Sequence, residues 1–429
     1  TAKILLKYLA EVACPGSDLH DRVLQTNPIM ENFGCAKTVW NNNSSRFGKF
    51  LTLQFNVSGR MQGAFMKTYL LEKSRIVNQL SGEQNYHVLY QVAKGMYGAH
   101  KGDWSMVDPE AWVYLNAKGS GGIMWNDLPS TFDELKEAFA TIPALQPVAE
   151  KCWRVLVAVL HLGNLTLAAK GEEDASFTKE TTKHVAACAK LLGVPASPQG
   201  GTPEEVLSKA ILSQNIKAGL DWIAKPNTSD YAQSVKDALS KAVRAHTRRL
   251  ERRRRGRPHA ALPAPPSPPS SSHPPLLLHP SAQVYSKMFD FVCEAINSSL
   301  MFGGDSRFFI GAVDIFGFEC FPTNSLEQLC INFANEKLQR MFTEAVFESV
   351  LAEYTKEGID VGGMTFEDNS AVVALIEGSP NGLLTLLSEE CFFPNGSDIG
   401  WLGKIKESHR KNPNFEGHVK ESKTSFTVM

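Results

Sequence analysis

Two short segments, far apart in the chain, carry the residue types that phosphate chemistry needs. Residues 41–50 read NNNSSRFGKF, and residues 314–319 read DIFGFE. In the first segment, the adjacent hydroxyls of Ser44 and Ser45 suit a phosphate group and a Mg²⁺ ion, because a hydroxyl can complete the oxygen octahedron around magnesium. Taken alone, this segment is also typical of an ordinary turn, since Asn and Ser are turn residues.

The second segment adds two carboxylates and a glycine amide. Asp314 can hold Mg²⁺ through a water molecule, and the absence of a side chain at Gly317 lets its amide approach a phosphate closely. Glu319 and Arg46 carry opposite charges and are expected to pair across the site. The alternative for this segment alone is a strand exit with a capping aspartate. The two segments together are far more specific than either one alone.

The elements that must position these segments include three strands. Residues 308–313 form a short continuous apolar run, which is typical of a strand buried on both faces of a parallel sheet, and the run leads directly into Asp314. Ligands collect at this end of the strands in open α/β sheets. Residues 50–57 alternate between apolar and polar side chains and are expected to form a hairpin with residues 64–71 across a turn at 59–63.

Helical periodicity covers much of the rest of the chain. Residues 360–429 have the pattern of short helices and loops. The longer helices are expected at residues 1–13, 18–30 with an interruption at Pro28, 82–98, 131–166, and from Pro322 to near Gly358.

The composition is that of an ordinary globular protein and excludes several function classes. Of the 429 residues, 43% are hydrophobic and 21% are charged, and the net charge of -1 gives no general attraction to nucleic acid or membrane. No apolar run reaches the ~18 residues of a membrane span, and the N-terminus carries no signal peptide. The eight cysteines form no C-x-x-C pair, so they indicate reduced, mostly buried thiols of a cytosolic protein and neither a zinc site nor a redox motif.

One stretch differs in composition from its surroundings. Residues 244–257 contain eight arginines, and residues 258–280 contain nine prolines with Ser and His between them. Such a composition cannot bury enough apolar surface to become ordered. Three interpretations compete: a disordered surface loop, a basic patch for nuclear localisation or nucleic acid, and a translated intron. We favour the intron, because deleting residues 243–283 joins Ala242 to Val284 in one uninterrupted amphipathic helix, and Val and Gln codons supply the usual intron borders.

With these motifs, the chain resembles the myosin motor domain over nearly everything except that stretch. Residues 41–50 match the switch I of that family, N-x-N-S-S-R-F-G-K-F, and residues 314–319 match its switch II, D-I-x-G-F-E. Kinesins share part of this pattern, but they continue the S-S-R with Ser-His and the Asp with L-A-G-S-E. Further similarities are T-Y-L-L-E-K-S-R at 68–75, G-E-x-N-Y-H at 82–87, H-L-G-N at 161–164 and the relay helix at 326–339.

The resemblance implies an α/β fold, namely a myosin motor core of the P-loop NTPase type with a mixed central sheet and many surrounding helices, incomplete at both ends. Residues 1–298 would form an upper 50-kDa-like part that carries switch I, with residues 243–283 as a retained intron or disordered insert. Residues 299–324 would hold the central-sheet strand and switch II. Residues 325–429 would form the relay helix and a truncated lower 50-kDa-like part.

The implied cofactors are ATP and Mg²⁺. By similarity, Ser45 is a ligand of Mg²⁺, and Asp314 holds the ion through a water molecule. Ser44 contacts the γ-phosphate and the attacking water, while Asn41 and Asn43 lie against the nucleotide phosphates.

The remaining implied roles belong to the closing of the site. The Gly317 amide binds the γ-phosphate, and Arg46 and Glu319 form the ion pair that closes the pocket. Closure excludes bulk water and strengthens each electrostatic contact. The implied catalytic residues are therefore Ser44, Arg46, Gly317 and Glu319, and the relay helix transmits the state of switch II as movement.

The implied partner is the actin filament, and the implied location is the cytoplasm, in a myosin complex on the cytoskeleton. The actin-contacting segments of the family fall near residues 376–412 and 215–232, without single residues assigned. Light chains or calmodulin are expected to bind only through sequence C-terminal to this chain. Neither a nucleic-acid partner nor direct membrane insertion is expected.

Two departures from the family pattern bear on activity. The phosphate loop G-x-x-x-x-G-K-S/T occurs nowhere in the chain, and Trp40 stands where the family often has Arg. We expect a fragment that starts just after the phosphate loop and ends before the converter, and that does not hydrolyse ATP alone although its parent is a motor ATPase. The alternative is a non-catalytic myosin-like actin-binding or scaffold protein that lacks a working phosphate loop.

Overall fold

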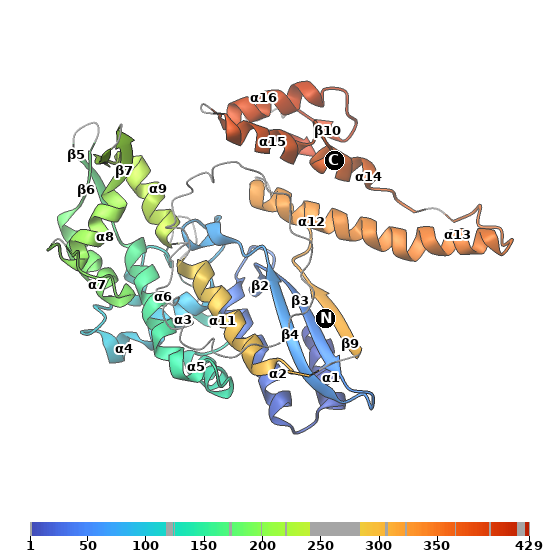
Figure 1. The fold of residues 1–429 in the computed structure, drawn as a ribbon, viewed down its shortest axis with the longest axis horizontal. Coiled ribbons are helices and arrows are strands. Elements are labelled where there is room, and N and C mark those ends of the chain that lie inside the picture. Colours follow the sequence, from blue (N-terminus) through green and yellow to red (C-terminus); the bar gives the residue numbers. More distant parts are fainter. Residues whose placement is uncertain are drawn as a thin grey trace. The chain divides into compact units, whose positions relative to one another are not determined.

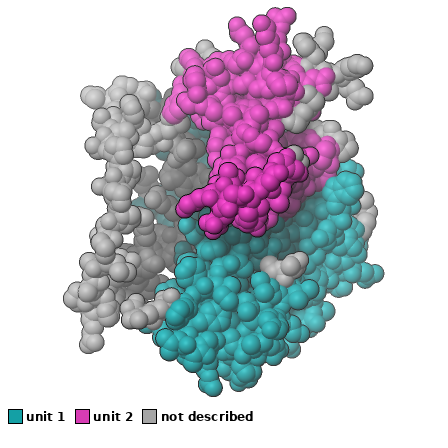
Figure 2. All heavy atoms as spheres, turned by 90° about the vertical axis from the view of Figure 1, so that its right-hand side faces the viewer, with its two compact units in different colours: residues 1–315 teal, residues 316–429 magenta. Residues whose placement is uncertain are grey.

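The chain divides into two compact units in a computed structural model. Unit 1 comprises residues 1–315 and unit 2 comprises residues 316–429 (Figure 2), and each is described by itself. The expected insertion at residues 243–283 lies outside the described residues. The structure describes residues 2–116, 123, 125–170, 174–198, 200–218, 221–240, 284–304, 308–321, 324–364, 366–393, 396–417 and 425–428.

Unit 1 is built around a three-stranded sheet in the order β4-β3-β9 (Figure 1). Strand β3 (Gly48–Phe55) pairs with β4 (Met61–Tyr69) as an antiparallel hairpin, which confirms the expected pair of strands. Strand β9 (Phe308–Asp314) lies on the other side of β3 and ends at Asp314, as expected. This sheet brings the start of β3 and the end of β9 together, although they are far apart in sequence.

The expectation of a parallel, doubly buried strand at residues 308–313 was wrong. Strand β9 runs antiparallel to β3, and its residues Phe308 to Gly311 are exposed. A run of apolar residues indicates that a strand can be buried, but it does not determine whether the neighbouring strand runs parallel or antiparallel to it. The α/β fold class is confirmed, with antiparallel pairing throughout the sheets of the described residues.

Three helices of unit 1 pack around this sheet: α1 (Ala2–Ala13), α2 (Asp18–Gly34) and α11 (Val284–Leu300). Leu6 and Ala10 of α1 are buried one helical turn apart, as the amphipathic pattern predicts. Helix α11 lies along β4, where the Asn297 side chain accepts a hydrogen bond from the Met66 amide and donates one to the Met66 carbonyl. Asn297 thus provides the hydrogen-bond partners of the Met66 backbone that a further strand would otherwise provide.

Helix α2 continues through Pro28, so the expected interruption was wrong. A proline inside a helix costs about 3 kcal/mol, because it removes one backbone hydrogen bond and crowds the preceding turn. The residues after it, Ile29, Met30 and Phe33, are at most 2% exposed. Burial of three such side chains outweighs that cost, since each contributes about 1.5–3 kcal/mol. Helix α2 therefore extends to Gly34, whose carbonyl accepts a hydrogen bond from the Arg46 amide of the 41–50 segment.

The rest of unit 1 is a helical layer whose centre is α6 (Ala149–Gly163), packed against α3, α7, α9 and α11. The expected helices 82–98 and 131–166 were each too long: the first begins only at His87 and is interrupted at Met96, and the second is divided around Pro143. The other helices are α3 (His87–Gly95), α4 (Tyr97–His100), α5 (Phe132–Thr141), α7 (Thr182–Leu192), α8 (Pro203–Leu212) and α9 (Ser229–Ser240).

Short elements connect these helices. Two antiparallel hairpins and one two-residue ladder complete the strands of unit 1: β5 (Leu167–Lys170) with β6 (Asp174–Phe177), β7 (Ser213–Ala218) with β8 (Asp221–Pro226), and β1 (Cys35–Ala36) with β2 (Ser44–Ser45). The 3₁₀ turns are η1 (Lys73–Ile76), η2 (Pro109–Ala111), η3 (Trp125–Asp127), η4 (Gln146–Val148) and η5 (Lys179–Thr181).

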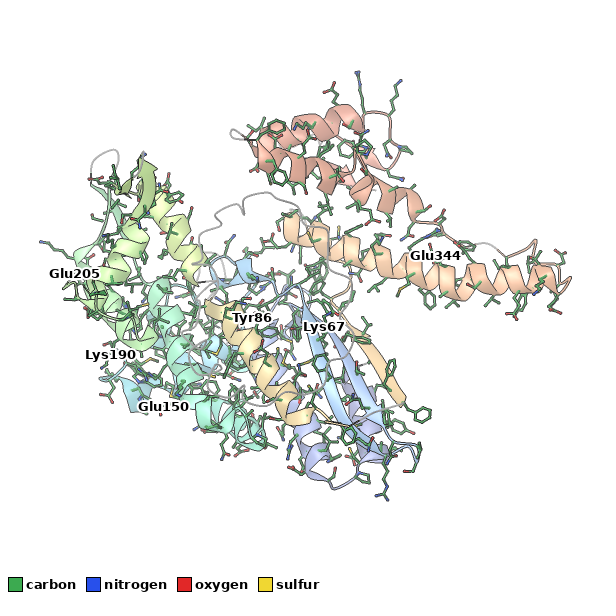
Figure 3. The ribbon with its side chains drawn as sticks, viewed as in Figure 1. Lys67, Tyr86, Glu150, Lys190, Glu205 and Glu344 are labelled. Carbon is green, nitrogen blue, oxygen red and sulfur yellow. The ribbon has the colours of Figure 1, made fainter. Side chains whose placement is uncertain are left out.

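Unit 2 begins with one long helix, as expected from the sequence. It consists of α12 (Leu326–Thr343), the π-helical turn η6 (Glu344–Glu348) and α13 (Ser349–Lys356), and Figure 3 marks Glu344 at the turn. A small core of Leu375, Leu383 and Ile405 joins the following helices. The remaining elements are α14 (Ser370–Glu377), α15 (Leu383–Phe392), α16 (Asp398–Ser408), β10 (Phe415–Glu416) and β11 (Thr427–Val428).

Candidate nucleotide site

The serines of the 41–50 segment are held by β1, the two-residue strand that follows helix α2. In the β1–β2 ladder, Cys35 is the partner of Ser45 and Ala36 is the partner of Ser44. Between the two strands, the Asn43 amide donates to the Asn41 side chain over 2.9 Å, which closes a local turn. The segment therefore contains a turn, which does not exclude a role in binding phosphate.

A cleft of about 240 Å³ opens beside this ladder in unit 1. It brings together three residues expected at the site: Asn43, Ser45 and Asp314. Ser44 and Asn41 do not line it. Its walls are formed by Lys3, Asn27, Met30, Glu31, Cys35, Asn43, Ser45, Phe47, Lys49 and Asp314.

The cleft contains two ion pairs. The Lys49 ammonium lies 2.9 Å from the Asp314 carboxylate, and Lys3 lies 2.9 Å from Glu31. The Cys35 Sγ atom is 3.5 Å from the Ser45 hydroxyl. Burial raises the pKa of the Cys35 thiol to about 11, so this thiol is neutral at physiological pH. The residues that line the cleft thus include a neutral thiol–hydroxyl pair as well as charged side chains.

The donor set fits a phosphate-bound Mg²⁺ ion. Magnesium prefers oxygen ligands, which the Ser45 hydroxyl and the Asp314 carboxylate supply, and ammonium groups such as Lys49 attract phosphate. The Asn43 Oδ1 atom is buried and has no hydrogen-bond partner among the described residues. It is therefore an acceptor that a bound ligand could satisfy. Within the described ranges, no group of three or more His, Cys, Asp or Glu residues forms a metal site of its own.

Arg46 does not line the cleft, although it directly follows Ser45, which does. Its side chain is buried, and its Nε atom donates to Glu72 Oε2 over 2.6 Å. The expected partner Glu319 belongs to unit 2, and the Arg46–Glu319 pair stays a prediction. Glu72 was not expected as a partner of Arg46, although it stands in the 68–75 motif.

In unit 2, residues 316–319 are fastened to the start of α12 by amide side chains. Asn332 accepts from the Glu319 amide and donates to the Glu319 carbonyl, each over 2.8 Å. Asn335 donates to the Phe316 carbonyl over 3.0 Å, and Gln328 donates to the Glu319 carboxylate over 3.2 Å. The spacing of these three amides, at i, i+4 and i+7, places them on one helix face, a signal that the sequence analysis missed.

Gly317 occupies open space in this arrangement. A Cβ atom at this position would meet no atom within 4 Å, and its φ is not in the left-handed region. The fold therefore does not itself require glycine here. A role of the Gly317 amide in binding phosphate, as expected from the sequence, would explain the glycine at this position.

A family model described as "Myosin head (motor domain)" matches residues 1–248 and 280–429. Curated relatives align along 100% of the chain: unconventional myosin-Vc of Homo sapiens at 34% identity over 432 residues, and myosin IA heavy chain of Dictyostelium discoideum at 32% over 438 residues. Myosin-15 of Arabidopsis thaliana is 34% identical over 434 residues. The chain spans 22%, 39% and 25% of the length of these three relatives, respectively. Within the described residues, no helix has the length and apolar character to cross a membrane.

Proposed function

Because this chain belongs to the myosin head family, we propose that it is part of a motor whose full-length form couples the hydrolysis of Mg²⁺-ATP to movement along actin filaments. The observation that carries the nucleotide part of this proposal is the cleft in unit 1. It gathers Asn43, Ser45 and Asp314 from two segments of the sequence, beside the lysine Lys49.

The residues of this chain have separate tasks in the proposed reaction. Ser45 and Asp314 would hold Mg²⁺, Asp314 through a water molecule, and the ion would supply positive charge that offsets charge on the transferring phosphoryl group. Asn41 and Asn43 orient the phosphates. Ser44 orients the attacking water, and this positioning is the larger part of catalysis in phosphoryl transfer.

Closure of the site is assigned to the second segment. The Gly317 amide donates to the γ-phosphate, and Arg46 and Glu319 pair to exclude bulk water. The amide contacts from Asn332 and Asn335 support the mechanical step that follows. Because they tie residues 316–319 to α12, a displacement of Gly317 is passed to the long helix within unit 2.

The partner assignments rest on the same family. We infer that actin is contacted through residues 376–412, which form α15, α16 and their surroundings, and through residues 215–232, which include the β7–β8 hairpin. The cytoskeleton is the corresponding location. Light chains or calmodulin are assigned to sequence outside these 429 residues, and no nucleic acid is assigned.

We further infer that these 429 residues alone do not hydrolyse ATP. The sequence contains no G-x-x-x-x-G-K-S/T loop, whose lysine and hydroxyl cradle the β- and γ-phosphates. The second candidate function is that of a myosin-like actin binder or scaffold without catalysis.

An ATPase assay separates the two functions. The full-length parent protein is expected to show turnover that actin stimulates, and Ser45→Ala and Asp314→Asn are each expected to reduce it about 10²-fold or more. The 429-residue chain, assayed in parallel, is expected to show none but to co-sediment with actin filaments. A parent without turnover that still co-sediments with actin establishes the scaffold. Actin-stimulated turnover by the 429-residue chain would refute its proposed inactivity.

A further inference from the structure

Arg46 is anchored at both its backbone and its side chain. Its amide donates to the Gly34 carbonyl over 2.8 Å, and its carbonyl accepts from the Glu72 amide over 2.9 Å. Its Nε atom donates to Glu72 Oε2 over 2.6 Å, and its side chain is 0% exposed. Glu72 therefore contacts Arg46 twice, once through the backbone and once through the carboxylate.

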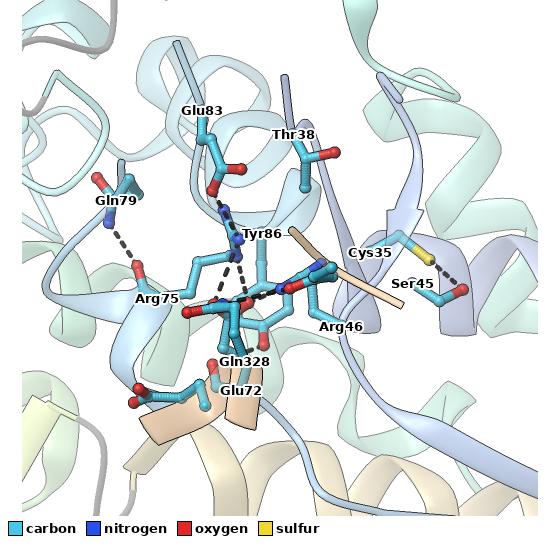
Figure 4. Close-up of polar contacts among 12 residues, drawn as sticks. Cys35, Thr38, Ser45, Arg46, Glu72, Arg75, Gln79, Glu83, Tyr86 and Gln328 are labelled. Carbon is cyan, nitrogen blue, oxygen red and sulfur yellow. Dashed lines mark hydrogen bonds and ion pairs between the residues drawn. The ribbon is translucent and has the colours of Figure 1, made fainter. Parts of the chain in front are cut away.

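The Glu72 carboxylate is shared between two arginines (Figure 4). Its Oε2 atom accepts from Arg46 Nε and from Arg75 Nε, each over 2.6 Å, while Arg75 Nη2 donates to Glu83 over 2.9 Å. Burial acts to raise the pKa of Glu72, but Arg75 and Arg46 together outweigh it and lower that pKa. The carboxylate is thus charged at neutral pH, and the cluster balances two positive and two negative charges.

The cluster rests on a rigid aromatic support. The Tyr86 hydroxyl donates to the Glu72 carbonyl over 2.8 Å, and the Tyr86 ring stacks on Tyr285 of α11 with centroids 4.9 Å apart. Figure 3 marks Tyr86 within unit 1. Because the Glu72 backbone is fixed in this way, its carboxylate has a defined position from which to hold Arg46.

Arg46 directly follows Ser45, whose hydroxyl lies in the wall of the cleft. We propose that Glu72 is a positioning residue that acts through Arg46: it fixes residues 44–46 in the ladder with β1 and so aims Ser45 into the cleft. This inference rests on the proposed nucleotide function and deepens it. It is compatible with the proposed Arg46–Glu319 pair, because Glu72 engages Nε and a guanidinium carries five N–H donors.

The alternative is that Glu72 only stabilises the core. A buried ion network commonly has this role, and removing one partner destabilises a fold whether or not the network positions anything. The two roles differ in where the structure loosens. Loss of a positioning residue frees the ladder around Ser45, whereas loss of a purely structural residue loosens the helical core as well.

Cys35 is a built-in reporter for this distinction. Its thiol contacts the Ser45 hydroxyl and the residue is 3% exposed, so alkylation requires the β1–β2 ladder to open. Cys152 in α6 and Cys188 in α7 are 2% and 0% exposed in the helical core, and they report loosening there. Alkylation by iodoacetamide under native conditions, followed by peptide mass spectrometry, measures all three thiols in one sample.

The test compares Glu72→Gln, which keeps the shape and removes the charge, with the wild-type 429-residue chain. We expect Cys35 to be alkylated about tenfold faster in this variant, while Cys152 and Cys188 stay protected. The matched control is Glu150→Gln on the exposed face of α6, which is expected to change none of the three rates.

Two results would overturn the proposal. Unchanged protection of Cys35 in Glu72→Gln means that Glu72 does not hold the ladder, and equal loss of protection at all three cysteines means that it only stabilises the core. If Glu72→Gln does not fold, Glu72→Asp keeps the charge but shortens the side chain, and a severalfold rise confined to Cys35 is expected. The assay needs no nucleotide, so its outcome is independent of whether the parent protein is an ATPase.

Discussion

The Lys49 ammonium lies 2.9 Å from the Asp314 carboxylate, and the two residues are direct cross-strand partners on β3 and β9. Lys49 belongs to the 41–50 segment and Asp314 opens the 314–319 segment, so one antiparallel register joins the two segments. Both side chains line the cleft. The acid proposed to hold Mg²⁺ through water is therefore already balanced by a cation of the chain itself.

We expect the Lys49–Asp314 pair to contribute weakly to stability. The two side chains are 19% and 35% exposed, and solvent screens such pairs. A double-mutant cycle with Lys49→Met and Asp314→Asn is expected to give a coupling free energy of about 0.5–1 kcal/mol at low salt. The measurement is urea unfolding of the two single variants and the double variant.

The salt dependence serves as the control for that cycle. In 1 M NaCl the coupling is expected to fall, because the Debye length shrinks to about 3 Å. Strictly additive effects of the two substitutions at low salt would show that the pair does not interact in solution.

The features predicted correctly from the sequence depend on local patterns. The β3–β4 hairpin follows from alternation and a short turn, and the long helix from Leu326 follows from periodicity over many turns. The position of Asp314 at a strand end follows from the apolar run that precedes it. In each case the residues that determine the feature are neighbours in the sequence.

The features that were missed depend on residues far apart in the chain. The direction of β9 is set by its pairing with β3, and the continuity of α2 through Pro28 is set by tertiary burial of Ile29 and Phe33. Glu72 becomes the partner of Arg46 only when the hairpin folds back. No local signal encodes such relationships, which is why the polar network behind the site was found only in the structure.

Asn332 is expected to couple the 316–319 segment to the long helix. Asn332→Ala removes two partly buried hydrogen bonds to the Glu319 backbone, each of which contributes about 0.5–1.5 kcal/mol. We therefore expect faster amide hydrogen exchange at Glu319 and its neighbours, with the exchange of α14–α16 unchanged. Hydrogen–deuterium exchange with peptide mass spectrometry measures both regions.

The matched control for this experiment is Gln339→Ala. Gln339 lies on the same helix and loses the same kind of amide group, but its side chain is exposed. Its exchange pattern is expected to equal that of the wild type. Protection of Glu319 that survives in Asn332→Ala would contradict the proposed link between the segment and the helix.

Removal of residues 243–283 is expected to leave unit 1 folded. Helix α9 is described up to Ser240 and α11 begins at Val284, and the family match omits residues 249–279. Closing a flexible loop of this length costs roughly 3 kcal/mol, so if the segment is such a loop, its deletion raises the free energy of unfolding by up to that amount. Thermal unfolding and circular dichroism of the deletion variant measure stability and helix content.

A comparison deletion distinguishes a dispensable insertion from an integral part of the fold. Removing residues 229–240 eliminates helix α9, whose Ala232 and Ser240 are 0% exposed, and is expected to destabilise unit 1 severely. If removing residues 243–283 is equally damaging, the segment is part of the folded domain and the intron interpretation is wrong.

The buried pair His161 and His184 is expected to make unit 1 less stable in mild acid. Their Nδ1 atoms are 2.8 Å apart, and His161 Nε2 lies 2.9 Å from the Trp104 carbonyl. The Nε2 atom therefore donates to that carbonyl, so the neutral His161 accepts at Nδ1 from His184. Charging His161 would place a second N–H at its Nδ1 atom, directly against the N–H of His184, and burial lowers the pKa of both histidines to about 4.

The sign of the effect follows from these lowered pKa values. Between their ordinary value near pH 6.5 and about pH 4, the unfolded chain binds more protons than the folded chain, so stability falls as the pH falls. The slope approaches about 1.4 kcal/mol per pH unit for each histidine. Urea unfolding at pH 7.0, 6.0 and 5.0, followed by tryptophan fluorescence, measures it. His184→Gln keeps an N–H donor for His161 and removes one titrating group, so it is expected to reduce the slope, and an unchanged slope would assign the acid sensitivity to other groups.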